Sequence, residues 1–205
     1  MAIDSKLADY CRLLASWPGL IGSGERPQRL VEDSLVLLPF LESGSSLIDV
    51  GTGGGMPGIP LRIAQPDLRV TLLESDQTKA SFLVFALAEL GLDDVEVVCE
   101  RAETLARGPR RESFEIACCR ALAPPSGAAE LCLPLVRIGG RALLMGSGQM
   151  LEETTSRLLG GAPAQLLDAP SAARGRGTVL QVRKLEPTPQ RFPRRAGLAS
   201  RRPLG

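Results

Sequence analysis

A chain of 205 residues is long enough for one domain with a substantial core, and it has no run of about 18 apolar residues that would suggest a membrane span. Its five cysteines are odd in number and do not have the spacing of a disulfide framework, which favours reduced thiols. The chain contains no histidine, which argues against a zinc site. The first residues lack a basic start followed by an apolar block, so we expect no signal peptide. These features predict a cytoplasmic protein that binds neither a membrane nor a metal.

The net charge of +1 is unevenly distributed along the chain. Residues 183–205 contain seven basic residues and one glutamate, so this segment carries +6 and the rest of the chain carries −5. An acidic body with a basic, proline-rich end indicates either that this end reaches a polyanionic partner or that it is a solvated terminus. Phe192 and Pro193 allow a further arrangement, in which they pack on the body or stack on a base.

Two amphipathic helices are expected at the start of the chain, over residues 3–16 and 27–41, with a loop rich in glycine and proline between them. Strands then alternate with helices. The strands are expected at residues 45–51, 68–75, 95–100, 114–120 and 140–146, and the helices at 58–65, 77–90 and 128–137. In the second of these helices, the face that we expect to be buried holds Ala80, Leu83, Val84 and Leu87. A short helix over 154–159 and two late strands that can pair, at 164–169 and 177–184, complete the predicted order.

This alternation predicts an α/β fold, with a mostly parallel sheet and helices on both faces. Ligands of such sheets bind at the carboxyl ends of the strands. The stretch IDVGTGGGMPGIP, residues 48–60, lies there, because it ends a strand, contains five glycines and opens the next helix. Glycine has no Cβ, so a turn of this kind lets a ligand approach the main chain.

Three cofactors are candidate ligands of this glycine loop. A nucleoside triphosphate needs Gly-Lys-Ser or Gly-Lys-Thr after the glycines, and the chain reads GGMPG instead. A nicotinamide dinucleotide needs GxGxxG, but here Gly51 and Gly53 are followed by Met56 in the third place. S-adenosylmethionine needs a similar turn and carries no phosphate. The loop therefore argues against the first ligand and leaves the other two open.

Residues after the next strands narrow the choice. Glu74 ends the second strand, where its carboxylate can accept from both ribose hydroxyls of NAD or of S-adenosylmethionine. Ala102 and Glu103 follow the third strand, where they are placed to hold an adenine edge. The stretch RIGGRALLM, residues 137–145, has a form that is usual in methyltransferases and unusual in dehydrogenases. Together these signals favour S-adenosylmethionine, with NAD as the alternative.

The motifs that some methyl acceptors require are absent. Attack by cytosine C5 needs a cysteine in Pro-Cys or Thr-Cys, and exocyclic amines are usually served by Asn-Pro-Pro-Tyr or Asp-Pro-Pro-Tyr, where this chain reads CCRALAPP. A hydroxyl acceptor needs a base or a metal. A ring nitrogen with a free lone pair, such as guanine N7, loses no proton, so the lack of an evident general base is compatible with it.

Six stretches resemble, in order, the bacterial glucose-inhibited division protein B family, the 16S ribosomal RNA guanine-N7 methyltransferases. They are VEDSLVLLPFL, IDVGTGGGMPGIPL, TLLES, RAE, CRALAP and PTPQRFPRRAGLASRRPL. The resemblance covers roughly residues 28–205. It implies a class I, Rossmann-like methyltransferase sheet, S-adenosylmethionine as the donor, and a guanine in the decoding-region loop of 16S rRNA, or of the small ribosomal subunit, as the acceptor.

The resemblance also implies roles for individual residues. The donor pocket would be lined by Gly51, Gly53, Met56, Glu74, Ala102 and Glu103. Arg120 would lie at the mouth between donor and RNA, where it would contact the donor and position the substrate, with no general base. Alternatively, it is a strand-end arginine paired with a carboxylate such as Glu130. The RNA would be bound by Arg191, Arg194, Arg195, Arg201 and Arg202 of the basic end.

The chain departs from the family pattern at three places. Leu30 stands where Arg-His-x-x-Asp-Ser has its histidine, Met145 where Lys-Gly has its lysine, and WPGLIGSG replaces an asparagine-rich turn. We expect all three to face the RNA and not the donor. Guanine-N7 methylation is the leading prediction. The alternatives are a divergent, weakly active or inactive RNA-binding relative and a small-molecule methyltransferase. We expect one structural unit with a helical cap (1–45), a methyltransferase domain (46–184) and a basic tail (185–205).

Overall fold

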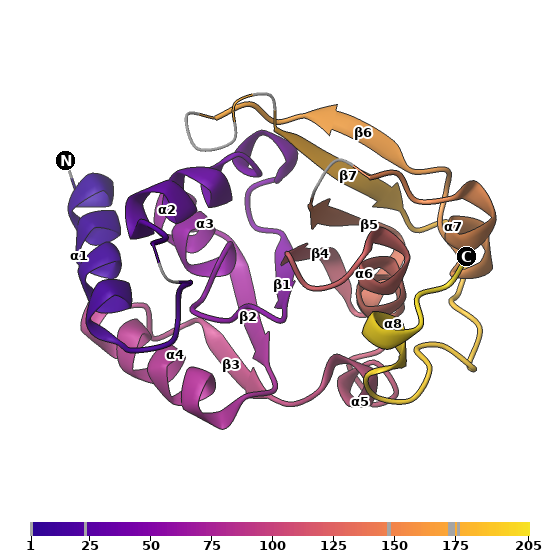
Figure 1. Cartoon of the computed structure of the whole chain (residues 1–205), viewed down its shortest axis with the longest axis horizontal. Helices are drawn as coiled ribbons and strands as arrows, with labels where there is room; N and C mark the ends of the chain where they lie inside the picture. Colours follow the sequence, from indigo (N-terminus) through magenta and orange to yellow (C-terminus); the bar gives the residue numbers. More distant parts are fainter. Residues whose placement is uncertain (1, 23, 147–148, 172–174, 176) are drawn as a thin grey trace.

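The computed structural model describes residues 2–22, 24–146, 149–171, 175 and 177–205. Its centre is a seven-stranded sheet in the order β3-β2-β1-β4-β5-β7-β6 (Figure 1). The strands are β1 (Ser46–Val50), β2 (Arg69–Glu74), β3 (Glu96–Cys99), β4 (Phe114–Arg120), β5 (Val136–Met145), β6 (Gln165–Asp168) and β7 (Thr178–Arg183). β1 to β5 are parallel, whereas β7 runs antiparallel to its neighbours β5 and β6. The first five strands therefore end at one edge of the sheet.

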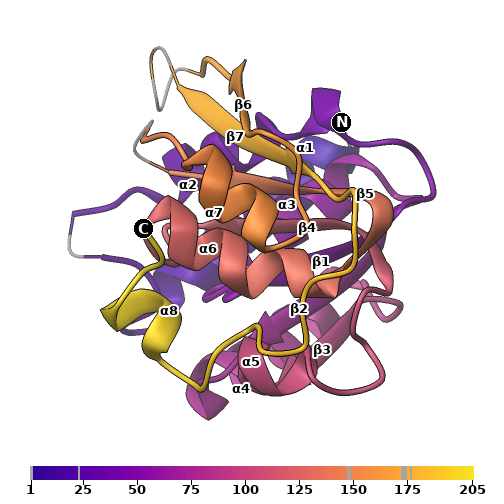
Figure 2. The same cartoon turned by 90° about the vertical axis from the view of Figure 1, so that its right-hand side faces the viewer.

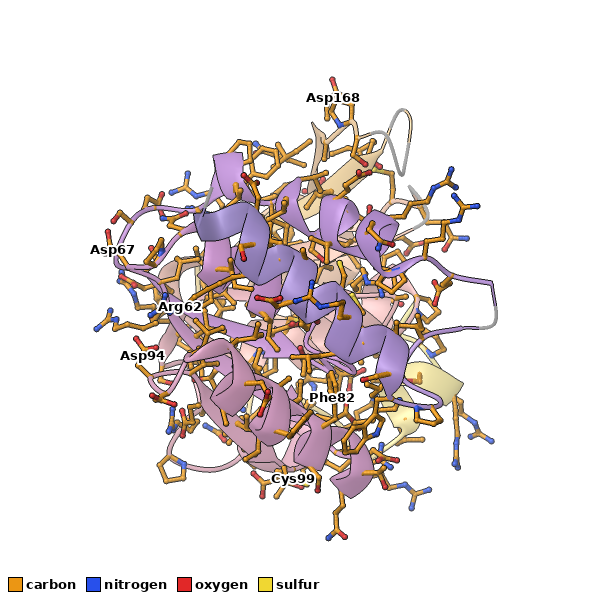
Figure 3. All side chains as sticks on the ribbon, turned by 90° about the vertical axis from the view of Figure 1, so that its left-hand side faces the viewer. Arg62, Asp67, Phe82, Asp94, Cys99 and Asp168 are labelled. Atoms are coloured by element: carbon orange, nitrogen blue, oxygen red, sulfur yellow. The ribbon has the colours of Figure 1, made fainter. Side chains whose placement is uncertain are left out.

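Helices cover both faces of this sheet (Figures 1 and 2). One face carries α1 (Ala2–Ser16), α2 (Pro27–Leu35), α3 (Gly58–Ala64) and α4 (Gln77–Leu90). The other carries α5 (Ala102–Leu105), α6 (Pro125–Cys132), α7 (Glu153–Leu158) and α8 (Leu198–Arg201). Figure 3 looks onto the first face, where Arg62 of α3 pairs with Asp94, in the turn before β3, at 2.6 Å. No helix among the described residues is long and apolar enough to cross a membrane.

The strand residues divide between two hydrophobic cores because successive side chains point to opposite faces of a sheet. In β1, Leu47 belongs to the core under α1–α4, and Ile48 and Val50 belong to the core under α5 and α6. Both faces of the central strands are buried, which accounts for their nearly continuous apolar sequence.

The helix α4 matches its predicted bounds because its ends are well specified. Asp76 accepts a hydrogen bond from the backbone N–H of Lys79 at the start, and Gly91 ends the helix with a φ of 59°. The predicted buried face was wrong at Val84, which is 59% exposed, whereas Phe82 is fully buried. Phe82 packs edge-on against Trp17 at a centroid distance of 5.4 Å, so the tertiary partner in α1 and its following turn decides which side faces inward.

Prolines shorten two of the predicted helices. The helix expected over 27–41 ends at Leu35, and a separate 3₁₀ turn covers Leu38–Phe40 around Pro39. The helix expected over 128–137 begins earlier, at Pro125, and ends at Cys132, before a 3₁₀ turn around Pro134. Proline has no N–H to continue an α-helix and also restricts the residue before it.

The strand β5 starts four residues before the predicted glycine. Its register against β4 shifts between Phe114 and Ile116, and a Cβ on Gly140 would lie 2.4 Å from the carbonyl oxygen of Glu115. The glycine thus allows the two strands to touch at an irregularity inside a longer strand. The two four-residue helices α5 and α8 were not predicted, because so short a segment has almost no periodic signal.

The basic end of the chain packs on the body. Phe192 is buried in the core under α5 and α6. Arg111 donates to the carbonyl oxygens of Thr188 and Phe192, and Glu112 accepts from the backbone N–H of Thr188. Lys184, fully buried, contacts Thr188 and lies 3.1 Å from Glu112. Of the arrangements left open by the sequence, the one in which Phe192 packs on the body is the one observed.

A buried ion pair fixes this C-terminal segment to α6. Glu130 is fully buried, and its carboxylate accepts hydrogen bonds from the backbone N–H and the guanidinium of Arg194, with distances from 2.7 to 3.1 Å. One helical turn earlier, a Cβ on Gly127 would lie 2.3 Å from the carbonyl oxygen of Ala199. The missing side chain therefore lets α8 lie directly on α6.

We predict that Arg194→Ala lowers the free energy of unfolding by about 3–5 kcal/mol, because it leaves the buried Glu130 carboxylate without its charged partner. Arg194→Lys should recover only part of this, since an ammonium cannot reproduce the planar contact. Urea unfolding followed by circular dichroism measures both changes. Arg195→Ala, at an exposed neighbour, is the matched control and should change the stability by less than about 0.5 kcal/mol. Equal losses of stability in Arg194→Ala and Arg195→Ala would contradict the role given to the ion pair of Arg194 with Glu130.

Candidate functional site

The glycine loop lies where β1 ends and α3 begins, at the carboxyl edge of the parallel strands. The backbone N–H groups of Gly51 and Thr52 both donate to the carbonyl oxygen of Leu73 in β2. From the other side, the hydroxyl of Tyr10 in α1 donates to the carbonyl oxygen of Gly54 at 2.7 Å. The loop is thus held between a neighbouring strand and the N-terminal helix.

Glu74, at the end of β2, forms part of this loop's support. Its Oε2 accepts from the N–H of Gly53 at 2.9 Å, and its Oε1 accepts from the N–H of Asp76 at 2.9 Å. An ionised carboxylate has about four acceptor positions, so both oxygens retain capacity for a ligand hydroxyl. The predicted ribose-binding residue therefore also fixes the glycine loop on which the ligand would lie.

Gly51 and Gly53 differ in what surrounds their missing side chains. Both have a positive φ, 69° at Gly51 and 59° at Gly53. A Cβ on Gly51 would lie 2.5 Å from the Cδ1 of Leu122, so the close approach there is made by the protein itself. A Cβ on Gly53 would meet no atom within 4 Å. The open side of the loop, where a ligand can approach the main chain, is therefore at Gly53.

Asp49 is a fully buried carboxylate beneath the loop. Its Oδ2 accepts from the hydroxyl of Thr52 at 2.5 Å and from the N–H of Gly58 at 2.8 Å, while its Oδ1 is buried with no hydrogen-bond partner among the described residues. Burial raises the pKa of Asp49 to about 6, against the opposing effect of those two hydrogen bonds. The site therefore contains an acceptor that lacks a donor.

The other residues predicted for the donor pocket belong to α5 and to the glycine loop itself. Ala102 and Glu103 form the first turn of α5, and the carboxylate of Glu103 accepts from the backbone N–H of Gly197 at 2.8 Å. Met56 is buried in the core under α1–α4. Glu103 thus links the predicted adenine side of the site to the C-terminal segment, a contact that the sequence did not reveal. The assignment of these residues to a donor remains a prediction.

Beside the loop, at the ends of β4, β5 and β7, lies a cleft of about 770 Å³. Apolar groups form much of its wall, among them Leu30, Leu144 and Met145. The first turns of α2 and α6 close its sides through Arg26, Arg29 and the segment 123–125. The cleft is large enough for a nucleotide-sized group and is separate from the donor residues named above. Two of the family departures, Leu30 and Met145, therefore line the cleft and not the glycine loop.

Arg120 ends β4 and lines this cleft. Its Nη1 lies 3.9 Å from the Oδ2 of Asp33 in α2, and the two side chains are 22% and 15% exposed. The alternative of a strand-end arginine paired with a carboxylate is met by Asp33 and not by Glu130, which binds Arg194. Arg120 and Asp33 thus present a donor group and an acceptor group side by side in one cleft.

The predicted RNA-binding arginines of the C-terminal segment fall into two groups. Arg194 is bound to Glu130 and to the carbonyl oxygen of Arg202. The side chains of Arg191, Arg195, Arg201 and Arg202 are exposed, and Arg191 lies over the ring of Phe192. In Figure 2, α8 lies at the same side of the molecule as the loop between α1 and α2. Gly24, Glu25 and Arg26, at the end of that loop, line the cleft.

Comparison with known proteins gives the family of the chain. The model of a family named GidB, described as rRNA small subunit methyltransferase G, matches residues 3–158. The chain belongs to the GidB family. A ribosomal RNA small subunit methyltransferase G from Rubrobacter xylanophilus is 39% identical, with 98% of this chain and 83% of that protein covered. The protein of the same name from Sorangium cellulosum is 41% identical, over 95% of this chain and 85% of the relative.

Solved structures agree on the fold. The apo structure of an S-adenosylmethionine-dependent methyltransferase, SibL, superposes with a TM-score of 0.62 at 16% identity, covering 88% of this chain and 70% of the other. The class I methyltransferase fold predicted from the sequence is confirmed. Membership of the GidB family confirms the predicted resemblance and, at the level of the family, the prediction of an S-adenosylmethionine-dependent rRNA methyltransferase.

Sequence reasoning missed Asp33, Arg26 and Arg29 as residues of the site. Each lies in α2 or just before it, and in the sequence only its charge distinguishes it from its neighbours. The stretch that contains Asp33 served only as a family motif. The signal that singles them out is their position in the cleft, which depends on how α2 packs against the sheet. Among the residues that the structure describes, no group of three metal-ligating side chains lies together.

We predict that Asp49 makes the protein less stable as pH rises from about 4 to about 6. Its folded pKa is about 6 and lies above the unfolded value of about 3.9, so the folded state binds more protons within this window. Asp49→Asn should remove that contribution, and its stability relative to the parent should rise by about 2–3 kcal/mol between pH 4 and pH 7. Urea unfolding of both proteins across this pH range measures the difference. The other carboxylates are the same in both proteins, so their contributions cancel. A difference independent of pH would contradict the assigned pKa.

Proposed function

We propose that this protein transfers the methyl group of S-adenosylmethionine to N7 of a guanine in the decoding-region loop of small-subunit ribosomal RNA, in the cytoplasm. The observation that carries the proposal is the meeting of two separate sites at the end of β4. The glycine loop with Glu74 lies on one side, and the arginine-lined cleft of about 770 Å³ lies on the other. A methyl donor and a purine placed in these two sites would face each other across Arg120 and the turn that follows it.

The residues of the loop fit the proposed donor. Gly53 leaves its backbone open to a ligand, and Glu74 can accept from ribose hydroxyls. No described residue donates to the buried Oδ1 of Asp49, which is an acceptor suited to a cationic N–H donor, such as the ammonium group of S-adenosylmethionine. Glu103 lies in the first turn of α5, after β3, where it would meet the adenine. Three carboxylates around a loop without a lysine favour a cationic donor over a dinucleotide, whose pyrophosphate is negative.

When bound, the donor supplies an activated methyl group on a sulfonium sulfur. The protein's task is alignment, because guanine N7 attacks with its lone pair and no proton leaves. Leu122 lies over Gly51, in the turn whose neighbouring residues Ala121 and Ala123 line the cleft. Arg120 holds the acceptor through O6 or a phosphate, since a hydrogen bond to N7 itself would block the reaction.

The exposed arginines of the C-terminal segment would bind the RNA backbone outside the cleft. Arg195, Arg201 and Arg202 project from a segment that is packed on α6 through Glu130 and Gly127. Because that segment is held in place, these charges keep a defined position relative to the cleft. Phosphate contacts of this kind position a nucleic acid without reading its sequence.

The test is methylation of small-subunit particles that lack this modification, with radiolabelled S-adenosylmethionine. We expect one labelled guanine in 16S rRNA, detected by borohydride reduction and aniline cleavage, which act on 7-methylguanine. Glu74→Ala should weaken donor binding by about tenfold to a hundredfold in calorimetry, because it removes a charged acceptor. Glu89→Ala, an exposed carboxylate of α4, is the control and should leave donor binding unchanged. Binding of NADH, or label at another base or on small molecules alone, would contradict the proposal.

We also predict that replacing Arg195, Arg201 and Arg202 by glutamine reduces the salt dependence of RNA binding. Each lost contact to a single-stranded site should lower the slope of log K against log salt by about 0.7, and three by about 2. Fluorescence anisotropy with a labelled RNA fragment between 50 and 300 mM salt, roughly the range over which such contacts are screened, measures this. The control is the double variant Arg69→Gln, Arg137→Gln, at the amino ends of β2 and β5, which should leave the slope unchanged. An unchanged slope in the triple variant would show that these arginines do not contact phosphates.

A further inference from the structure

The arginines of the described chain are of two kinds, those that are paired with a carboxylate and those that are not. The first kind forms ion pairs at 2.5–2.9 Å and includes Arg62, Arg110, Arg137, Arg141, Arg157 and Arg194. Arg26 and Arg29 are of the second kind, because the guanidinium group of neither has a hydrogen bond or an ion pair to a residue that the structure describes. Both side chains are exposed, and both line the cleft. Two positive charges therefore lie unpaired at the edge of the proposed acceptor site.

The stability of α2 does not explain why these arginines lie at its start. Arg26 precedes the first helical residue, Pro27, and Arg29 lies in the first turn, which contains no acidic residue. A positive charge is unfavourable near the amino end of a helix. The next residue, Leu30, is buried in the core under α1–α4, so the turn that carries the arginines is fixed to the body. The two charges thus have a defined position that costs stability, which is expected of residues that serve a ligand.

The two acids that line the cleft do not neutralise this pair. Glu25 accepts a hydrogen bond from the backbone N–H of Gly22 at 2.6 Å, and Asp33 lies 3.9 Å from the guanidinium of Arg120. The negative charge that would complete Arg26 and Arg29 must therefore come from a partner. A phosphate group is well suited, because the planar fork of a guanidinium can donate two parallel hydrogen bonds to its oxygens.

A second group of arginines lies across the cleft. The cleft has the first turn of α2 on one side and Pro124 and Pro125, at the start of α6, on the other. α8 lies directly on α6, where a Cβ on Gly127 would be 2.3 Å from the carbonyl oxygen of Ala199. The exposed arginines of α8 and its flanks are Arg195, Arg201 and Arg202. Because α8 and the loop that leads to α2 lie on the same side of the molecule (Figure 2), an RNA strand that touches both groups must cross the mouth of the cleft.

We propose that Arg26 and Arg29 bind the phosphates on one side of the target nucleotide and that the arginines of the C-terminal segment bind those on the other side. This rests on the proposed function, which places the target guanine in the cleft. Backbone contacts on both sides position the RNA without reading its sequence and leave the base between them able to turn into the cleft. Such a path requires a loop or a single strand, whose bases can be splayed out. Arg26 and Arg29 are positioning residues, which act on RNA binding and not on the methyl-transfer step.

The test removes charges from both partners. The probe is a fluorescently labelled single-stranded RNA with the sequence of the decoding-region loop, in which two phosphates on the 5′ side or on the 3′ side of the target guanine are uncharged methylphosphonates. The parent should bind each modified RNA about threefold to thirtyfold more weakly than the unmodified RNA. The double variant Arg26→Gln, Arg29→Gln should become insensitive to one modification and remain sensitive to the other. The triple glutamine variant of the C-terminal arginines should show the reverse pattern.

Salt dependence and kinetics distinguish this role from a structural one. The double glutamine variant should lower the slope of log K against log salt by about 1.4, whereas the double variant Arg26→Lys, Arg29→Lys should keep most of the slope because it keeps the charge. On small-subunit particles, the glutamine variant should raise KM severalfold and leave kcat and donor affinity unchanged. Gln28→Ala removes an exposed side chain between the two arginines and is the matched control, which should behave as the parent.

Three outcomes would overturn the proposal. They are a parent that does not bind the RNA probe, a double glutamine variant that is as sensitive as the parent to both modified RNAs, and a loss of donor affinity as large as the loss of RNA affinity. In the last case the arginines would support the fold and not the RNA. The binding measurements need no methyl transfer, so a parent that binds the probe but labels no guanine in particles would refute the proposed function alone.

Discussion

Two carboxylates hold the glycine loop in shape by accepting hydrogen bonds from its backbone, and the rest of the site is placed relative to that loop. Asp49 binds Gly58 from below, and Glu74 binds Gly53 from the side. Both are buried, and at Asp49 the hydrogen bonds from Thr52 and Gly58 only partly offset the cost of burial. The raised pKa of Asp49 is the measure of that remaining cost. A cationic ligand would lower the pKa of Asp49. The cost of burying this carboxylate in the free protein would then contribute to the affinity for the donor.

The parallel sheet brings the donor side and the acceptor side together. β1, β2 and β4 run the same way, so the glycine loop, Glu74 and Arg120 all emerge at one edge. The turn after β4 then separates them, with Leu122 packed over Gly51 and its neighbours lining the cleft. Because the two sites share this turn, a change at its residues would affect both the donor and the acceptor.

The C-terminal segment serves as a structural strap as well as a basic surface. Arg194 neutralises the buried Glu130 of α6, and the backbone of Gly197 binds Glu103 of α5. The strap therefore connects the helix beside the acceptor cleft with the helix beside the proposed adenine position. A basic tail that was free in solution would concentrate charge near the RNA, whereas this one presents its arginines from a fixed position.

The sequence by itself determined the features that depend on local backbone chemistry. The glycine loop, the strand that precedes it and the capped helix after β2 follow from glycine freedom, apolar patterning and the Asp76 cap, and the motifs identified the family. Only the tertiary structure decided which charges meet. Glu130 could have paired with either Arg120 or Arg194, and Asp33 carried no sign that it would lie beside Arg120. Such pairs join residues far apart in the chain, and their geometry arises from how helices pack on the sheet, which no local pattern encodes.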